Sequence, residues 1–288
     1  MENDNSSRSI ASTGGAEKRP GSYEFSAAHV STASVGYDLD PVIGIDHFNM
    51  RVPVFAPHPH AGFSAVTYLF EDSEGEFINR DSLGHQIVTQ PGATIWTVAG
   101  SGILHEEFPR ERGKLSHGLQ VFVNLAAAAK MQAPRVLFVD GPEVPVFERQ
   151  GIRVRVMAGT SGDVQGKLEP PGNITFLDIK LDADAAFEQV LPPDQSVLAY
   201  VIEGSVLVGD ERRRLSVLDA VSFAADGDAV FLRATTEGAR VVLIAGRPLR
   251  ERIVSHGPFV MNSEEQIASA FENYRAGRMG KLDPFKAT

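Results

Sequence analysis

The chain has 288 residues, of which 43% are hydrophobic and 22% are charged, so it can bury a full core and has the length of about two ordinary domains. Its 27 basic and 37 acidic side chains give a net charge of −10 at neutral pH, which argues against direct binding to nucleic acid. Cysteine is absent, which excludes disulfides, thiolate metal sites and cysteine nucleophiles. Any metal must therefore bind mainly to His, Asp or Glu.

The N-terminal segment is polar. Residues 1–22 are rich in Gly and Ser, and we expect them to form a disordered tail. They lack the apolar stretch of a signal peptide, and no run of about 18 apolar residues follows anywhere in the chain. The sequence thus predicts no membrane partner and a cytoplasmic location, or a nuclear one in a eukaryotic cell.

Short runs rich in β-branched and aromatic residues follow, separated by turns that contain Gly, Asp and Pro. This spacing predicts an all-β protein built from antiparallel sandwiches or barrels. The runs are Val66–Phe70, Gln86–Gln90, Thr94–Ala99, Leu119–Leu125, Arg135–Val139, Ile152–Ala158, Ile174–Leu181, Ser196–Gly204, Ser205–Gly209, Ala220–Ala224, Ala229–Ala234 and Ala239–Gly246.

The two halves of the chain share a weak repeat, in which a strand, an acidic turn, a strand, a turn and a strand after a Gly turn recur. We therefore expect one β domain over residues 23–145 and a second over residues 146–255. The stretch Gly141–Gly151, which begins and ends with glycine and contains two prolines, is the expected linker.

Only the C-terminal extension, residues 256–288, has a helical pattern. Ser263 and Gln266 form a capping-box signature, with Asn262 as the neighbouring cap. Gly277 is the expected end of the helix. One apolar stripe, expected to cover the surface of a β domain, consists of Ile267, Ala270, Phe271 and Tyr274.

The histidines are unevenly distributed. Six of the eight lie between positions 47 and 117, and none lies between 118 and 255, so only the first domain can hold a histidine site. His58 and His60 are two residues apart, as are His105 and Glu107, and on strands each pair shares one face. If both pairs face the interior, three imidazoles and one carboxylate converge. We expect His29, His47, His85, His117 and His256 to have structural or surface roles.

Such a donor set leaves two open positions on an octahedral ion, unlike the closed tetrahedral set of structural zinc. It extends by one ligand the two-histidine, one-carboxylate arrangement of non-haem iron enzymes. Iron(II) is therefore the favoured cofactor, and manganese, nickel, copper and cobalt remain as alternatives.

Several long motifs carry a family resemblance. The segments DHFNMRVPVFAPHPHAGFSAVTYLFED, DSLGHQIVTQPGATIWTVAGSGILHEEFP, SHGLQVFVNL and IAGRPLRERIVSHGPFVMNSEEQI resemble, in the same order, the pirin family of two-domain cupins. The resemblance implies two antiparallel β-barrel (jelly-roll) domains, with metal ligands at His58, His60, His105 and Glu107 in the first and none in the second.

The family resemblance implies two kinds of function. Some members resemble quercetin 2,3-dioxygenase, which cleaves a flavonol with O₂; others are similar to iron-dependent, redox-sensitive transcriptional co-regulators that bind partner proteins. In the enzyme reading Glu107 acts as general base, and Phe55, Trp96 and Phe122 are expected to line the substrate pocket. A bicupin with a vestigial metal site is a third alternative.

The sequence departs from the family pattern near the expected site. Ala61 and Ser64 replace the usual basic and acidic residues, while Ile95 and Ser101 replace Gln and Arg. These changes leave the four expected ligands in place and leave the substrate open. The oligomeric state also has no signal in the sequence.

Overall fold

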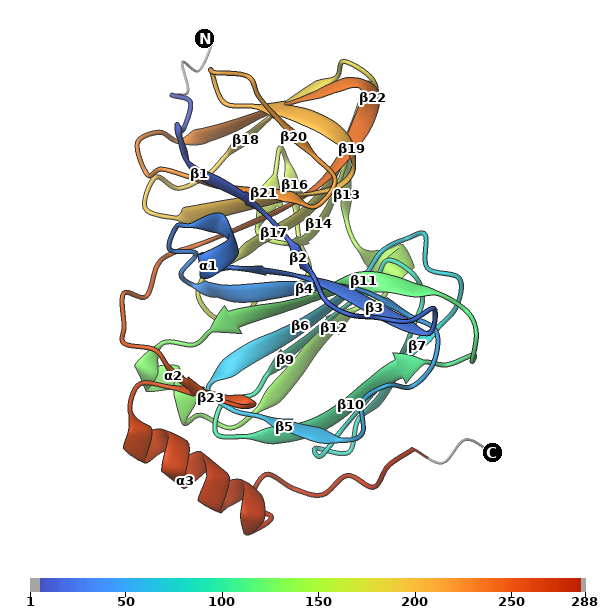
Figure 1. The fold of residues 1–288 in the computed structure, drawn as a ribbon, viewed down its shortest axis with the longest axis vertical. Coiled ribbons are helices and arrows are strands. Elements are labelled where there is room, and N and C mark those ends of the chain that lie inside the picture. The colour runs from blue at the N-terminus through green and yellow to red at the C-terminus, as the bar shows by residue number, and fades with distance from the viewer. Residues whose placement is uncertain (1–5, 286–288) are drawn as a thin grey trace. The chain divides into compact units, whose positions relative to one another are not determined.

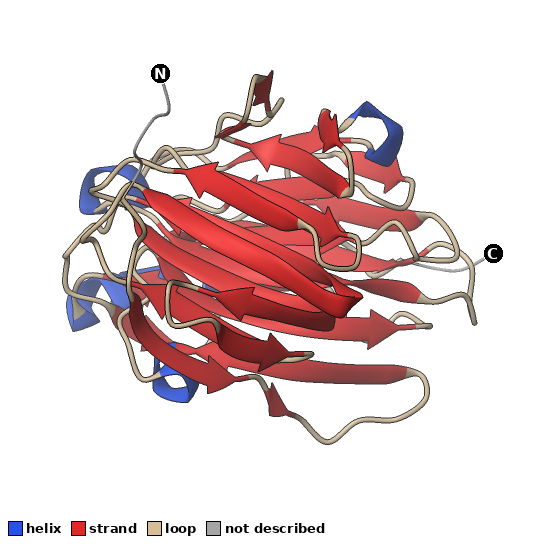
Figure 2. Ribbon diagram, turned by 90° about the horizontal axis from the view of Figure 1, so that it is seen from above, coloured by secondary structure: helices blue, strands red, loops and turns tan. Residues whose placement is uncertain are grey.

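Strands dominate the computed structural model, which describes residues 6–285 (Figure 2). The mostly-β fold predicted from the sequence is therefore confirmed. The described helices are α1 (Thr32–Val35), α2 (Ala127–Lys130), the single 3₁₀ turn η1 (Gly141–Glu143) and α3 (Glu264–Arg275). Among residues 6–285, none of the helices combines the length and the apolar character that crossing a membrane would require.

The described chain divides into two compact units. Unit 1 takes the residues up to Glu17 together with His29–Gly44 and Val144–Pro248. Unit 2 takes Lys18–Ala28, Ile45–Glu143 and the residues from Leu249 onwards. Each unit is thus assembled from separate stretches of the chain.

Unit 1 contains a nine-stranded antiparallel sheet in the order β1-β21-β19-β22-β17-β14-β13, with β18 also paired to β22 and β20 to β19. Its core consists of alternating apolar residues such as Val154, Val156, Leu177 and Ile179. The strands are β1 (Ile10–Gly15), β13 (Val146–Arg149), β14 (Ile152–Ala158), β17 (Thr175–Leu181), β18 (Ala186–Val190), β19 (Ser196–Val208), β20 (Arg213–Ser216), β21 (Asp219–Phe223) and β22 (Ala229–Gly246), with a separate hairpin of β15 (Thr160–Ser161) and β16 (Val164–Gln165).

Two long strands replace four short ones that the sequence predicted. The runs on either side of Gly204 form the single strand β19, and the runs at 229–234 and 239–246 form β22. Gly204 has φ +64°, and the β19–β22 register shifts on both sides of it. Glycine tolerates this left-handed conformation, so the chain forms a bulge there and the pairing continues past it.

The prediction of a disordered N-terminal tail differs from the structure over residues 6–22, while residues 1–5 lie outside the described part. β1 pairs antiparallel with β21, so its backbone hydrogen bonds come from a strand more than 200 residues away. The buried Arg8 guanidinium donates to the carbonyls of Gln195 and Pro192, both at 2.6 Å. A polar composition could not reveal this order, because the partners belong to the far end of the sequence.

Unit 2 contains two sheets. The four-stranded sheet has the order β5-β10-β7-β8, and most of a seven-stranded sheet, in the order β12-β9-β6-β11-β4-β3-β2, belongs to this unit. The strands are β2 (Glu17–Lys18), β3 (Phe25–Ser31), β4 (Val42–Met50), β5 (His58–His60), β6 (Phe63–Leu69), β7 (Phe77–Asp81), β8 (Gln86–Thr89), β9 (Thr94–Val98), β10 (Ile103–Pro109), β11 (Ser116–Asn124) and β12 (Arg135–Val139).

The C-terminal extension packs on unit 2. A hairpin of β23 (Val254–His256) and β24 (Phe259–Met261) precedes α3, which is the red helix in Figure 1. Ala61 forms an isolated bridge with Phe259. Ser263 is the N-cap of α3 and accepts from the backbone of Gln266, as the sequence predicts. The Gln266 side chain instead accepts from the Asn262 backbone at 2.9 Å, which moves the second capping bond one residue outwards.

Candidate metal centre

Three imidazoles converge on neighbouring strands of the four-stranded sheet. His58 and His60 occupy alternate positions of β5 and therefore share one face. β10 runs antiparallel to β5 with His105 directly opposite His58. The ring centroids lie 4.7–4.9 Å apart, and one nitrogen from each ring falls within 4.8 Å of the others. Strand parity and register together thus gather three potential ligands for one ion.

Glu107 shares the face of His105, two residues further along β10. Its buried carboxylate lines the same cavity as His58 and His60, and its Oε1 accepts a 2.6 Å hydrogen bond from the Thr67 hydroxyl of β6. The carboxylate is outside the cluster of three nitrogens that meet within 4.8 Å, so its role as a fourth ligand remains a prediction. The neighbouring Glu106 points to the other face, where it pairs with Arg80.

Burial sets the charge of these groups. Desolvation lowers the pKa of His60 to about 3, and lowers the pKa values of His58 and His105 as well. All three imidazoles are therefore neutral at pH 7 and keep a lone pair for a metal. Burial raises the pKa of Glu107 to about 7, against the opposing effect of the Thr67 hydrogen bond.

One hydrogen bond defines which His58 nitrogen is available. His58 Nδ1 lies 3.0 Å from the Ala56 carbonyl, which can only accept, so Nδ1 carries the proton. The lone pair then belongs to Nε2. Hydrogen bonding of the outer nitrogen to a carbonyl is the usual way in which proteins orient metal-binding histidines.

Polar atoms without protein partners surround the three rings. His60 Nδ1, His105 Nδ1 and both amide atoms of Asn79 are buried and have no hydrogen-bond partner among the described residues. Asn79 lies directly opposite Glu107 in the β7–β10 pairing. Such groups in a native interior point to an ion or to water that completes the site. The donor set of neutral imidazoles and a carboxylate therefore fits a transition metal of borderline character.

The cluster of three imidazoles lies at a cavity of about 360 Å³, which His58 and His60 line. Its walls come from both sheets of unit 2 and are largely aromatic, which suits a small aromatic ligand. Phe25 and Phe55 meet edge to face at 5.4 Å, and Phe55 is 47% exposed. The lining residues are Arg19, Phe25, Ala27, Asp46, Phe48, Met50, Phe55, His58, His60, Phe77, Glu107, Gln120 and Phe122.

The aromatic residues expected in the pocket have different positions. Phe55 and Phe122 line the cavity. Trp96 does not: Thr67, which contacts Glu107, pairs with Ile95, so the next residue, Trp96, faces the opposite side of the sheet. Phe25, Phe48 and Phe77 line the cavity without having been predicted, although the alternation of Asp46, Phe48 and Met50 along β4 was a usable signal.

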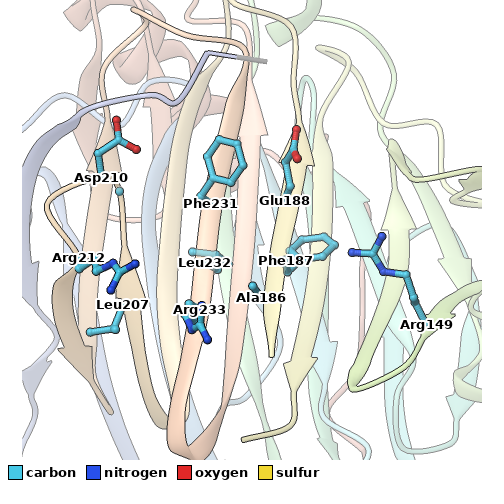
Figure 3. Close-up of a pocket in the computed structure, with 11 residues that line it drawn as sticks. Arg149, Ala186, Phe187, Glu188, Leu207, Asp210, Arg212, Phe231, Leu232 and Arg233 are labelled. Atoms are coloured by element: carbon cyan, nitrogen blue, oxygen red, sulfur yellow. The ribbon is translucent and has the colours of Figure 1, made fainter. Parts of the chain in front are cut away.

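A larger hollow in unit 1, of about 510 Å³, has different chemistry (Figure 3). Its labelled side chains are arginines, two acids and apolar residues from β13, β18, β19 and β22 and the turn after β19, and no imidazole is among them (Figure 3). It therefore lacks the ligand set that distinguishes the cavity of unit 2.

The other histidines form local contacts. His117 Nδ1 lies 2.7 Å from Asp72, and its Nε2 lies 2.7 Å from the Nε2 of His47. His85 pairs with Asp81, and His256 packs edge to face on Phe271. Among the described residues, none of these four imidazoles joins the cluster of three, although Asp81, the partner of His85, lies directly opposite His105 in the β7–β10 pairing.

The mostly-β fold and the histidine-lined cavity define a cupin-type protein with a candidate transition-metal site. The sequence profile described as Pirin matches residues 13–123, and that described as the Pirin C-terminal cupin domain matches residues 176–280. Mouse Pirin is 37% identical over 246 residues, which span 84% of each protein. The chain belongs to the pirin family.

Two further similarities concern dioxygenases. A Pseudomonas aeruginosa protein, provisionally named as a quercetin 2,3-dioxygenase, is 36% identical over 250 residues, covering 83% of this chain and 86% of that protein. The crystal structure of quercetin 2,3-dioxygenase from Acinetobacter baumannii superposes with a TM-score of 0.85 at 27% identity, covering 96% of this chain and 99% of the other.

Proposed function

We propose that this chain is an iron(II)-dependent dioxygenase that uses O₂ to cleave flavonols of the quercetin type, with each unit folded as a jelly-roll barrel. The observation that carries the proposal is the convergence of three neutral imidazoles at an aromatic-lined cavity that also holds Glu107. The names of the two dioxygenase relatives support the substrate class.

In this proposal His58, His60, His105 and Glu107 bind the metal, with manganese, nickel, copper and cobalt as alternatives to iron. The bound metal would supply Lewis acidity and a place for O₂ beside the substrate. Burial keeps the imidazoles unprotonated, and the Ala56 carbonyl holds the His58 ring with Nε2 available.

The protein's own residues bind the flavonol and accept its proton. Phe55 and Phe122 would pack against the flat rings and exclude water. Burial raises the pKa of Glu107 to about 7 in the metal-free protein, so the cavity favours a proton on this carboxyl, and we assign it to accept the proton of the flavonol hydroxyl. The proton moves from the hydroxyl oxygen to a Glu107 carboxylate oxygen, which leaves the substrate as an oxyanion.

The proposed reaction is tested by mixing iron-loaded protein with quercetin in air and following the flavonol absorbance. We expect its loss to require both iron and O₂, and to be abolished in His105→Ala. A protein with full iron occupancy that leaves the absorbance unchanged would rule out this substrate class.

A regulatory role is the second proposal, and one observation favours it. β10 places His105 and Glu107 on one face, with Glu107 lining the cavity, and Glu106 on the other face, where it pairs with Arg80. A change of iron oxidation state could thus reach a surface recognised by a partner protein. This role predicts partner binding that differs between iron(II) and iron(III) protein, without quercetin turnover.

A further inference from the structure

The hydrogen bonds around Glu107 extend one residue beyond Thr67. Thr67 Oγ1 lies 2.6 Å from Glu107 Oε1 and 3.1 Å from the side-chain oxygen of Gln120 on β11. Thr67 and Gln120 are direct partners in the β6–β11 pairing, so their side chains share one face. All three side chains meet on the cavity side of the sheets.

The donors and acceptors in this group do not balance in the orientation just described. A hydroxyl has one hydrogen, and Thr67 cannot donate it to both Glu107 and Gln120. Gln120 Nε2, meanwhile, is buried with no acceptor. Exchanging the oxygen and nitrogen of the Gln120 amide removes the conflict, because Nε2 then donates to Thr67 and Thr67 donates to Glu107.

We propose that Gln120 and Thr67 are positioning residues that hold the Glu107 carboxylate in one orientation beside the three imidazoles. This inference rests on the proposed metal site and names residues that act through Glu107. Thr67 is the only hydrogen-bond donor that the described residues offer to this carboxylate. Without it, one Glu107 oxygen loses its partner and the side chain gains rotational freedom.

In the hydrogen-bond series from Gln120 through Thr67 to Glu107, the two positioning residues have unequal effects on the carboxylate. Thr67 contacts Glu107 directly, whereas Gln120 acts only by orienting the Thr67 hydroxyl. Removing the hydroxyl should therefore make the identity of residue 120 irrelevant to Glu107. If Thr67 and Gln120 instead acted on Glu107 independently, the effects of changing each would add in the double variant.

The first test is cobalt(II) affinity, measured by competition with a chromophoric chelator. We expect Thr67→Val, which keeps shape and strand preference, to weaken binding by about 10- to 100-fold, the usual effect of losing a partner of a metal ligand. Thr67→Ser should restore affinity, because it restores the hydroxyl. Gln120→Leu should weaken binding less, and adding it to Thr67→Val should cause no further loss.

Thr94→Val is the matched control. Thr94 is as buried as Thr67 and lies on the neighbouring strand β9, but it pairs with Tyr68 and so faces the other side of the sheet. Its hydroxyl has no hydrogen-bond partner among the described residues. We expect Thr94→Val to bind cobalt(II) as the unmodified protein does.

Crystal structures of the metal-free protein and of Thr67→Val give a readout that does not depend on metal binding. We expect one Glu107 conformer in the former and displaced or multiple conformers in the latter. An unchanged Glu107 side chain in Thr67→Val, or unchanged cobalt affinity, would overturn the positioning role. If the unmodified protein bound no cobalt, the proposed metal-dependent function would fail, while the two crystal structures would still decide the role of Thr67.

Discussion

At the scale of single residues, burial determines the chemistry of the site. Desolvation acts in opposite directions on the two types of group: it removes protons from His58, His60 and His105 and favours a proton on Glu107. The metal-free site is thus close to neutral. A cation that replaces the Glu107 proton gains a carboxylate without having to remove protons from the rings.

The raised pKa of Glu107 predicts a pH-dependent stability of the metal-free protein. The pKa rises from 4.5 to about 7, so folding favours the protonated form, and its contribution is present below pH 4.5 and lost as the pH rises through 7. Glu107→Gln removes this loss. In urea titrations we expect the variant to gain up to roughly 3 kcal/mol relative to the unmodified protein at pH 8, under about 1 kcal/mol at pH 5, and close to nothing at pH 4. A difference that does not vary with pH would contradict this.

Metal binding should also stabilise the fold. A ligand at 100 times its dissociation constant adds about 2.7 kcal/mol to the free energy of unfolding. We therefore expect iron(II) or nickel(II) to raise the melting temperature of the unmodified protein measured by calorimetry. His105→Ala, which removes one of the three converging rings, should show little or no rise; an equal rise would place the binding site elsewhere.

At the scale of elements, buried Lys130 links α2 to the loop that follows the histidine strand. Its ammonium donates to the carbonyls of Gly62 and Val260 and to the side chain of Asn124. It thereby ties the segment after His60 to the C-terminal extension. The sequence offered no sign of this, since a lysine that follows four alanines is typical of a solvent-exposed helix position.

Replacing Lys130 should loosen this part of unit 2. Lys130→Met keeps much of the side-chain volume but leaves buried carbonyl oxygens without a donor, at a cost of about 1–3 kcal/mol for each group. We expect the free energy of unfolding, measured in urea, to fall by roughly 2–4 kcal/mol. Lys114→Met, on an exposed turn, is the control and should change little. Equal effects of the two variants would contradict a specific role for Lys130.

At the scale of the whole molecule, each unit combines distant stretches of sequence. β1 completes the edge of a sheet in unit 1 by pairing with β21, and Arg8 anchors it. Arg8→Met removes two charge-assisted hydrogen bonds to carbonyls. We expect a loss of about 2 kcal/mol, or a fall in melting temperature of about 4–8 °C, with cobalt(II) affinity unchanged. A melting temperature equal to that of the unmodified protein would show that β1 is not anchored by Arg8.

The sequence by itself determined the β class, the α3 helix with its Ser263 cap, and the placement of His58 and His60 on one face of a strand. These features are local: strand alternation and helix capping depend on residues within a few positions of each other. The family motifs are local as well, because each is a continuous run.

Only the tertiary structure decided which segments meet. The register that places His105 opposite His58, the contact of Thr67 with Glu107, the ordering of residues 10–15 and the exclusion of Trp96 from the cavity all depend on pairing between strands. A shift of one residue in any such pairing moves every side chain of a strand to the opposite face. Hydrophobic burial against distant partners sets that register, so it cannot be derived from any single stretch of the chain.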